Sequence, residues 1–265
     1  MSPAVSPSID HLELAWRSVE SLCADLTEAQ WNTPTGCPGW SVKDNLSHLV
    51  DYEARALGRA GPDHAPADVS HTKNPLGESN EVGVDFRRAA SGATVLDEFR
   101  EVTAARSEQL RALRAEDLRA EMVTPAGPGT LADMLTLRVM DTWSHEQDIR
   151  RALGRPGHVD GPAVVESVEY WARVLPLIVA KRAAASDGST VLVEVGDVCR
   201  RSIAVEGGRA SVVDGIAGTP TVALKIPAAT FAALVGGRSD APDDVLVEGD
   251  EALGRAIVAK LGFMP

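Results

Sequence analysis

The chain has 265 residues, enough for one large domain or for two modest ones that each bury a hydrophobic core. Its net charge of -12, from 26 basic and 38 acidic residues, argues against nucleic acid as a partner, because nucleic-acid binding needs a concentrated basic surface. Hydrophobic residues make up 44% of the chain, yet no apolar run approaches the roughly 20 residues that a membrane-spanning helix needs.

The start of the chain and its cysteines both indicate the cytoplasm. The N-terminal sequence MSPAVSPSIDH lacks the basic start and the apolar core of a secretory signal. Cys23, Cys37 and Cys199 are an odd number at wide spacings, which predicts thiols in a reducing compartment and no disulfide framework. We therefore expect a cytoplasmic protein that binds no membrane.

Helical periodicity dominates the first 157 residues. Helices are predicted over residues 9–26, 41–58, 81–113 with a break near Gly92, and 131–153. Thr130 with Asp133 is a capping pair that predicts the start of the last helix, and Gly154 predicts its end. Loops are predicted over residues 33–40, 60–80 and 122–129. Four principal helices with short connections are typical of a helical bundle.

Residues 158–265 are expected to form a small α+β domain. Residues 164–182 are predicted as one helix, and after it the apolar period drops from 3.6 to two. Strands are predicted over residues 190–195, 199–207, 209–215, 220–226 and 245–248, and helices over 228–234 and 251–261. Gly207-Gly208 is a hairpin signal. The predicted fold class is α+β with two domains, a helical bundle over residues 1–157 and a small α+β domain over 158–265.

One face of the helix over residues 131–153 combines apolar and ionisable side chains. At about 3.6 residues per turn, one stripe contains Arg138, Asp141, His145 and Asp148. A carboxylate and an imidazole four residues apart are costly to bury unless they bind something, so Asp141 and His145 are predicted metal ligands. Arg138 and Asp148 are predicted to orient these ligands. The alternative is that Arg138 and Asp148 lie on a solvated salt-bridge face.

His48, on the helix over residues 41–58, is the natural third ligand. Two helices of one bundle can point inward at a common point, and a set of two histidines and a carboxylate leaves a coordination position open. The alternative is a single hydrogen-bonded histidine at a helix interface. Cys37, just before a helix start, is a candidate nucleophile because a helix dipole can lower a thiol pKa, but the sequence assigns it no base.

Two stretches of the N-terminal half resemble the mycothiol-dependent maleylpyruvate isomerase family. They are WNTPTGCPGWSVKDNLSHL at residues 31–49 and RVMDTWSHEQDIRRALGRP at residues 138–156. That family belongs to the wider DinB-like group of metal-binding four-helix bundles. The final GDEALGRAIVAKLGFMP resembles the family's C-terminal domain, a small α+β unit related to sterol carrier proteins.

The resemblance implies a divalent metal, typically zinc, held by His48, Asp141 and His145, with mycothiol as thiol cosubstrate. It also implies a functional arginine from the C-terminal domain near a cleft between the domains, and Arg238 is the matching position. In the characterised isomerase the acidic ligand is glutamate, whereas Asp141 is one methylene shorter. We therefore expect weak isomerisation of maleylpyruvate and thiol-dependent activity on another electrophile.

A thiol at the open position of a zinc site loses its proton and becomes a strong nucleophile. The leading hypothesis is therefore a metal-dependent enzyme that activates a low-molecular-weight thiol, for transfer to a small electrophile or for isomerisation of that electrophile. The resemblance implies that this thiol is mycothiol. A second hypothesis is a metal-dependent hydrolase, in which water takes the place of the thiol. A third is a non-catalytic regulator that binds a metal or a lipid. We expect small-molecule partners and a monomer or a dimer.

Overall fold

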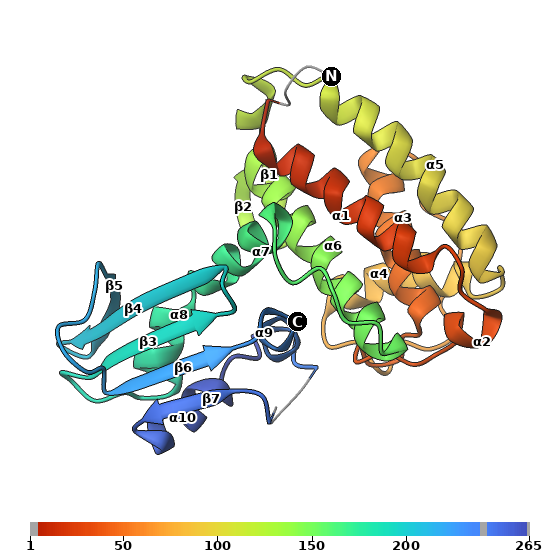
Figure 1. Ribbon diagram of the computed structural model, residues 1–265. Coiled ribbons are helices and arrows are strands. Elements are labelled where there is room, and N and C mark those ends of the chain that lie inside the picture. The colour runs from red at the N-terminus through yellow and green to blue at the C-terminus, as the bar shows by residue number, and fades with distance from the viewer. Residues whose placement is uncertain (1–4, 239–242, 264–265) are drawn as a thin grey trace. The chain divides into compact units, whose positions relative to one another are not determined.

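The computed structural model of this protein describes residues 5–238 and 243–263. The chain divides into two compact units, Met1–Gly157, which is mainly helical, and His158–Met264, which contains a five-stranded sheet (Figure 1). The predicted α+β fold class is thereby confirmed. Within the described ranges, no helix combines the length and the apolar character that crossing a membrane requires.

Four long helices of the N-terminal unit pack around one apolar core. They are α1 (Pro7–Cys23), α3 (Val42–Ala56), α5 (Gly92–Arg111) and α6 (Leu131–Leu153). Helices α1 and α3 each contact both α5 and α6, so every long helix has two long neighbours. The space between them is filled by buried side chains that include Leu12, Leu46, Phe99 and Trp143. This arrangement is a four-helix bundle.

The sequence signals for the ends of α3 and α6 are confirmed. The Thr130 hydroxyl accepts the Asp133 amide hydrogen while the Asp133 carboxylate accepts that of Thr130, a reciprocal capping box. Ser41 and Asp44 form the same box at the start of α3. Gly154 ends α6 with a φ of 63°, a left-handed conformation that glycine adopts without steric cost.

Two separate helices replace the single broken helix that was predicted over residues 81–113. Helix α4 (Pro75–Arg87) begins inside the segment predicted as a loop, because Asn74 caps it by accepting the Gly77 amide hydrogen and Pro75 is favourable in the first turn. Helix α5 starts anew, with the Ser91 side chain as its cap. Both helices pack against α3.

Shorter elements complete the N-terminal unit. They are α2 (Glu28–Trp31), the 3₁₀-helix η1 (Asp117–Arg119) and the strands β1 (Glu121–Thr124) and β2 (Gly127–Thr130). The two strands form an antiparallel hairpin in the segment that was predicted as a plain connection, so that prediction is wrong. The sequence there is too rich in glycine and proline to show a two-residue period.

The C-terminal unit is built on a sheet with strand order β5-β4-β3-β6-β7. The strands are β3 (Thr190–Val195), β4 (Cys199–Glu206), β5 (Arg209–Val213), β6 (Val222–Ile226) and β7 (Leu246–Gly249). Strands β3 and β6 are parallel, and the other neighbouring pairs are antiparallel. Alternate residues of β3, Val191, Val193 and Val195, are buried on one face. The turn predicted at Gly207-Gly208 joins β4 to β5, as expected.

The helices of this unit differ from prediction at one point. Helix α10 (Glu251–Val258) packs on β6 and β7, and α9 (Ala228–Val235) packs on α7 (Pro162–Ala172). The single helix predicted over residues 164–182 is instead α7, the short α8 (Leu175–Leu177) and a π-helix, η2 (Ile178–Arg182). Pro176 has no amide hydrogen to donate to the Ala172 carbonyl, which explains why α7 cannot continue.

Candidate metal centre

Helix α6 turns its polar stripe toward the interior of the bundle. The side chains of Arg138, His145 and Asp148 are 3%, 8% and 4% exposed, and that of Asp141 is 27% exposed. The alternative that Arg138 and Asp148 lie on a solvated salt-bridge face is therefore wrong. Buried charged groups need partners, and α3 supplies most of them.

His48 on α3 lies opposite Asp141 and His145. Its Nε2 is 3.2 Å from Asp141 Oδ2, and His145 Nε2 is 3.6 Å from Asp141 Oδ1. The centroids of the two imidazole rings are 4.8 Å apart. Each of the three residues offers one ligand atom within 4.8 Å of the other two. The structure thus brings together the three side chains that the sequence named as ligands.

Burial and neighbouring charges together decide the protonation of this trio. Burial lowers the pKa of His48 and so favours its neutral form. Burial alone would raise the pKa of Asp141, but the Arg138 guanidinium and the two imidazoles hold it well below its usual range. Burial also opposes a charge on His145, yet the adjacent Asp141 carboxylate raises the pKa of His145 well above its usual value. Asp141 is therefore an ionised oxygen donor.

Arg138 is fixed by a buried ion-pair network. Its Nη1 lies 2.6 Å from Asp141 Oδ2, and its Nε lies 2.8 Å from Glu53 Oε1. The second Glu53 oxygen is 3.2 Å from Arg106 Nε, which extends the network to α5. The Arg138 guanidinium carbon lies 3.6 Å from the centre of the Tyr52 ring. The network places the Arg138 guanidinium directly against the Asp141 carboxylate, and the role of Arg138 in orienting a metal ligand stays a prediction.

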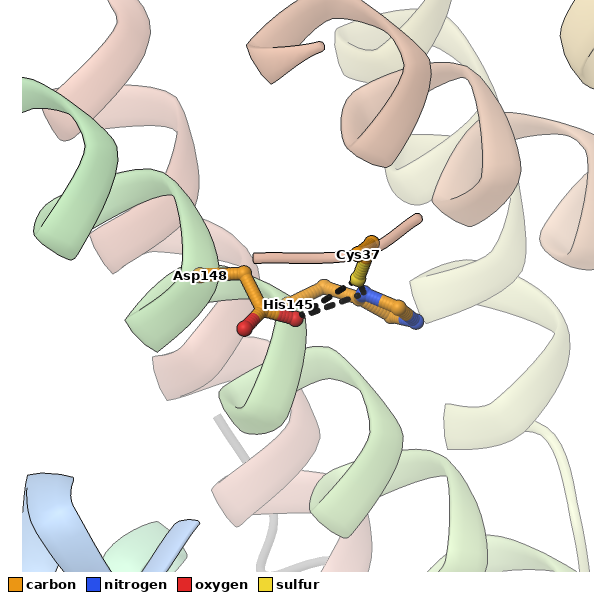
Figure 2. Close-up of side chains that lie close together, drawn as sticks. All are labelled: Cys37, His145 and Asp148. Atoms are coloured by element: carbon orange, nitrogen blue, oxygen red, sulfur yellow. Dashed lines mark hydrogen bonds and ion pairs between the residues drawn. The ribbon is translucent and has the colours of Figure 1, made fainter. Parts of the chain in front are cut away.

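Three groups surround the other ring nitrogen of His145. Its Nδ1 is 2.8 Å from Asn45 Oδ1, 3.4 Å from Asp148 Oδ2 and 3.9 Å from Cys37 Sγ. The Cys37 thiol donates to Asp148 Oδ2 at 3.0 Å, and Figure 2 shows Cys37, His145 and Asp148 converging. These three residues form a second group with ligand atoms within 4.8 Å of one another.

Asn45 keeps a hydrogen on Nδ1 of His145. The Asn45 amide nitrogen donates to the Thr35 hydroxyl and to the Ser41 carbonyl, so its oxygen must be the atom that faces His145. A carbonyl oxygen only accepts, so Nδ1 of His145 carries a hydrogen and Nε2 faces Asp141. A metal ligand needs this arrangement, because its second nitrogen is normally held by a hydrogen-bond acceptor.

The loop between α2 and α3 carries both Cys37 and Trp40. The Trp40 ring packs beside the two histidines of the trio formed by His48, Asp141 and His145. The Trp40 ring lies 5.3 Å from the His48 ring and 5.7 Å from the His145 ring, and its Nε1 donates to Glu81 Oε2 at 2.8 Å. Gly39 has a φ of 75°, and a Cβ there would lie 2.6 Å from the His71 ring, so the turn requires glycine.

Asn45 and Trp40 were not predicted as site residues, and Cys37 was considered only as a nucleophile without a base. Asn45 precedes His48 by three residues, nearly one helical turn, so the sequence could have placed both on the same face of α3. The contacts of Cys37 and Trp40 depend on the path of a Pro/Gly-rich loop, which helical or strand periodicity cannot reveal.

A comparison with protein families matches the N-terminal part of the chain. Residues 12–150, more than half of the chain, match the family described as the mycothiol maleylpyruvate isomerase N-terminal domain. The chain belongs to this family. The range contains His48, Asp141 and His145 as well as Cys37 and Asn45.

Two relatives of this member of the family are uncharacterized proteins of Mycobacterium tuberculosis. They are Rv0036c from strain H37Rv and MT0041 from strain CDC 1551 / Oshkosh, each 28% identical over 150 residues. Each match covers 56% of the chain and 57% of the relative, so the chain spans a little over half the length of these relatives.

Solved structures extend the likeness in fold to the second half of the chain. Crystal structures of the mycothiol-dependent maleylpyruvate isomerase and of a mutant of it align with a TM-score of 0.54. The identity is 14%, and the alignment covers 93% of each chain. At this identity the alignment shows a common fold and nothing finer.

The trio of His48, Asp141 and His145 fits a divalent metal. Ligand atoms at about 2.0–2.2 Å from a tetrahedral zinc ion lie roughly 3.3–3.6 Å apart. In the trio, His48 Nε2 lies 3.2 Å from Asp141 Oδ2 and His145 Nε2 lies 3.6 Å from Asp141 Oδ1, and both distances are close to this range. Two imidazole nitrogens and a carboxylate are donors that zinc accepts, and three protein ligands leave one position open.

Arg238 lies in the C-terminal unit, just after α9. Its guanidinium donates to the Gly236 carbonyl. The functional role of Arg238 stays a prediction from the family resemblance.

Proposed function

We propose that this protein is a metal-dependent enzyme that activates a low-molecular-weight thiol, mycothiol, for reaction with a small electrophile. Membership of the mycothiol maleylpyruvate isomerase family supports a thiol-dependent isomerase activity. The observation that carries the proposal is the convergence of His48, Asp141 and His145 on one point inside the bundle.

In this proposal His48, Asp141 and His145 hold a divalent cation, zinc by the chemistry of the donors. A bound zinc ion would supply Lewis acidity that lowers the pKa of a thiol at its open position. Arg138 keeps the Asp141 carboxylate ionised and oriented. Asn45 and Asp148 contact Nδ1 of His145, the ring nitrogen that does not face Asp141. The Trp40 ring beside both imidazoles keeps water away from one side of the site.

We further propose that residues 158–265 form a sterol-carrier-like domain that contributes Arg238 to substrate binding, and that the enzyme works in the cytoplasm. The isomerase that shares this fold is named for maleylpyruvate. Asp141 is shorter than the glutamate expected from the resemblance, and about 1 Å of misplacement can change a rate about a hundredfold. The substrate we propose is therefore a different small electrophile, with either transfer or isomerisation as the outcome.

An assay with zinc-loaded protein tests this proposal. Mycothiol is added with maleylpyruvate and with a panel of small unsaturated or halogenated electrophiles, and loss of thiol and change of electrophile are followed. We expect turnover of a panel compound that requires both mycothiol and the metal, with maleylpyruvate turned over weakly. Turnover without thiol would favour the metal-dependent hydrolase, and robust maleylpyruvate turnover would contradict the altered substrate.

A further inference from the structure

We propose that Cys37, Asn45, His145 and Asp148 form a second cation site, closed to substrates, that binds a thiophilic divalent metal softer than zinc, such as cadmium. This site lies on the Nδ1 side of His145, whereas the trio with His48 lies on the Nε2 side. The inference goes beyond the proposed function and does not depend on any thiol substrate.

The spacing of the donors is that of a small metal's coordination shell. Cys37 Sγ lies 3.0 Å from Asp148 Oδ2, 3.5 Å from Asn45 Oδ1 and 3.9 Å from His145 Nδ1. His145 Nδ1 lies 3.4 Å from Asp148 Oδ2 and 2.8 Å from Asn45 Oδ1. A tetrahedral zinc ion with bonds of about 2.0–2.3 Å has ligand atoms roughly 3.3–3.7 Å apart, so shifts of a few tenths of an ångström suffice.

The chemistry of the four donors selects a soft cation. A thiolate and an imidazole favour zinc and softer metals over magnesium or calcium. Binding replaces the hydrogen bond from Cys37 to Asp148, and the thiol proton leaves to solvent. The thiolate and the Asp148 carboxylate then carry two negative charges, which balance the charge of the cation.

Burial and rigidity make the site a closed one. All four residues are at most 7% exposed, and Asn45, His145 and Asp148 lie on the long helices α3 and α6. Cys37 alone lies on a loop, where its amide donates to the Thr35 hydroxyl at 3.2 Å. Four protein ligands leave no position for a substrate, as in structural zinc sites.

The shared histidine makes the two sites compete. A neutral imidazole has one available nitrogen lone pair. It is on Nε2 while the Nδ1 hydrogen is donated to Asn45, and it is on Nδ1 only after that proton is lost from Nδ1 and Nε2 carries one instead. A cation held by Cys37 therefore withdraws His145 from the trio. A thiophilic metal would in this way displace the metal proposed for catalysis.

Cadmium titration of the metal-free protein tests the second site. Bound Cys37 thiolate gives a sulfur-to-cadmium charge-transfer absorbance in the ultraviolet. We expect this absorbance in the parent protein, in Cys199→Ser, which changes another buried cysteine, and in His48→Ala, which damages only the trio. Cys37→Ser and Cys37→Ala should lose it, with circular dichroism confirming that both variants are folded.

The result that would overturn the proposal is no charge-transfer absorbance in the parent, or an equal absorbance in a folded Cys37 variant. Competition is tested on zinc-loaded protein, where cadmium should release one zinc ion for each cadmium bound. Retention of zinc beside cadmium would overturn the competition between the sites. Because Cys37 is not part of the trio, failure here is distinct from failure of the proposed catalytic metal.

Discussion

His145→Ala should purify without a metal ion. His145 is the one residue that belongs to both candidate donor groups, and its Nε2 faces Asp141 while its Nδ1 faces Asn45 and Asp148. Alanine removes both nitrogens. It leaves two ligands in the trio, and in the second site three donors without an imidazole, and neither set should hold zinc stoichiometrically. Elemental analysis should therefore fall from about one zinc per chain in the parent to nearly none in the variant.

His64→Ala is the matched control for this experiment. His64 also pairs with a carboxylate, Asp85, at 2.7 Å, but it lies outside both donor groups. That variant should keep its zinc. Asp148→Ala leaves all three ligands of the trio in place and removes a carboxylate beside Nδ1 of His145, so zinc binding at the trio should weaken about 10–100-fold. One zinc ion per chain in His145→Ala would show that His145 is not a metal ligand and would contradict the proposed metal centre.

Glu53→Ala should destabilise the protein by about 3–5 kcal/mol, the cost of breaking a buried ion pair by removing one partner. Glu53 is fully buried, and its two oxygens are paired with Arg138 at 2.8 Å and with Arg106 at 3.2 Å. Its loss leaves two arginines without their carboxylate in the interior of the bundle. Urea unfolding followed by circular dichroism measures the change in the free energy of unfolding.

Glu98→Ala is the matched control for Glu53. Glu98 pairs with Arg87 at 2.7 Å, but its side chain is 36% exposed. Arg87 is buried but keeps Asp51 as a second partner at 3.2 Å, and water reaches Glu98, so this loss should cost on the order of 1 kcal/mol. Equal destabilisation by the two substitutions would show that the Glu53 network contributes no more than a surface ion pair. Glu53→Gln should fall between them, because it keeps the volume and one acceptor.

The sequence predicted the parts of the fold that local chemistry controls. The box formed by Thr130 and Asp133 and the left-handed Gly154 set both ends of α6, and both are properties of a few adjacent residues. The start of α4 at Pro75 and the hairpin over residues 121–130 were missed. In each case the surrounding Pro, Gly and Asn residues hide the periodicity on which the prediction relied.

The candidate site shows the same limit. Asp141 and His145 follow from a four-residue spacing on one helix, and His48 follows from the geometry of a bundle. Cys37 approaches His145 over a separation of 108 positions in the chain, through a loop without periodicity. Such a contact depends on tertiary packing, so the sequence offered Cys37 as a nucleophile and could not name its neighbours.

Calorimetric titration of mycothiol into the protein tests the central claim of metal-dependent thiol activation most directly. The titration is carried out on zinc-loaded protein and on the same protein after removal of the metal with a chelator. We predict that mycothiol binds the zinc-loaded form and releases a proton, and that the metal-free form shows no measurable binding. Equal affinity for the two forms, or no binding to the zinc-loaded form, would contradict the account.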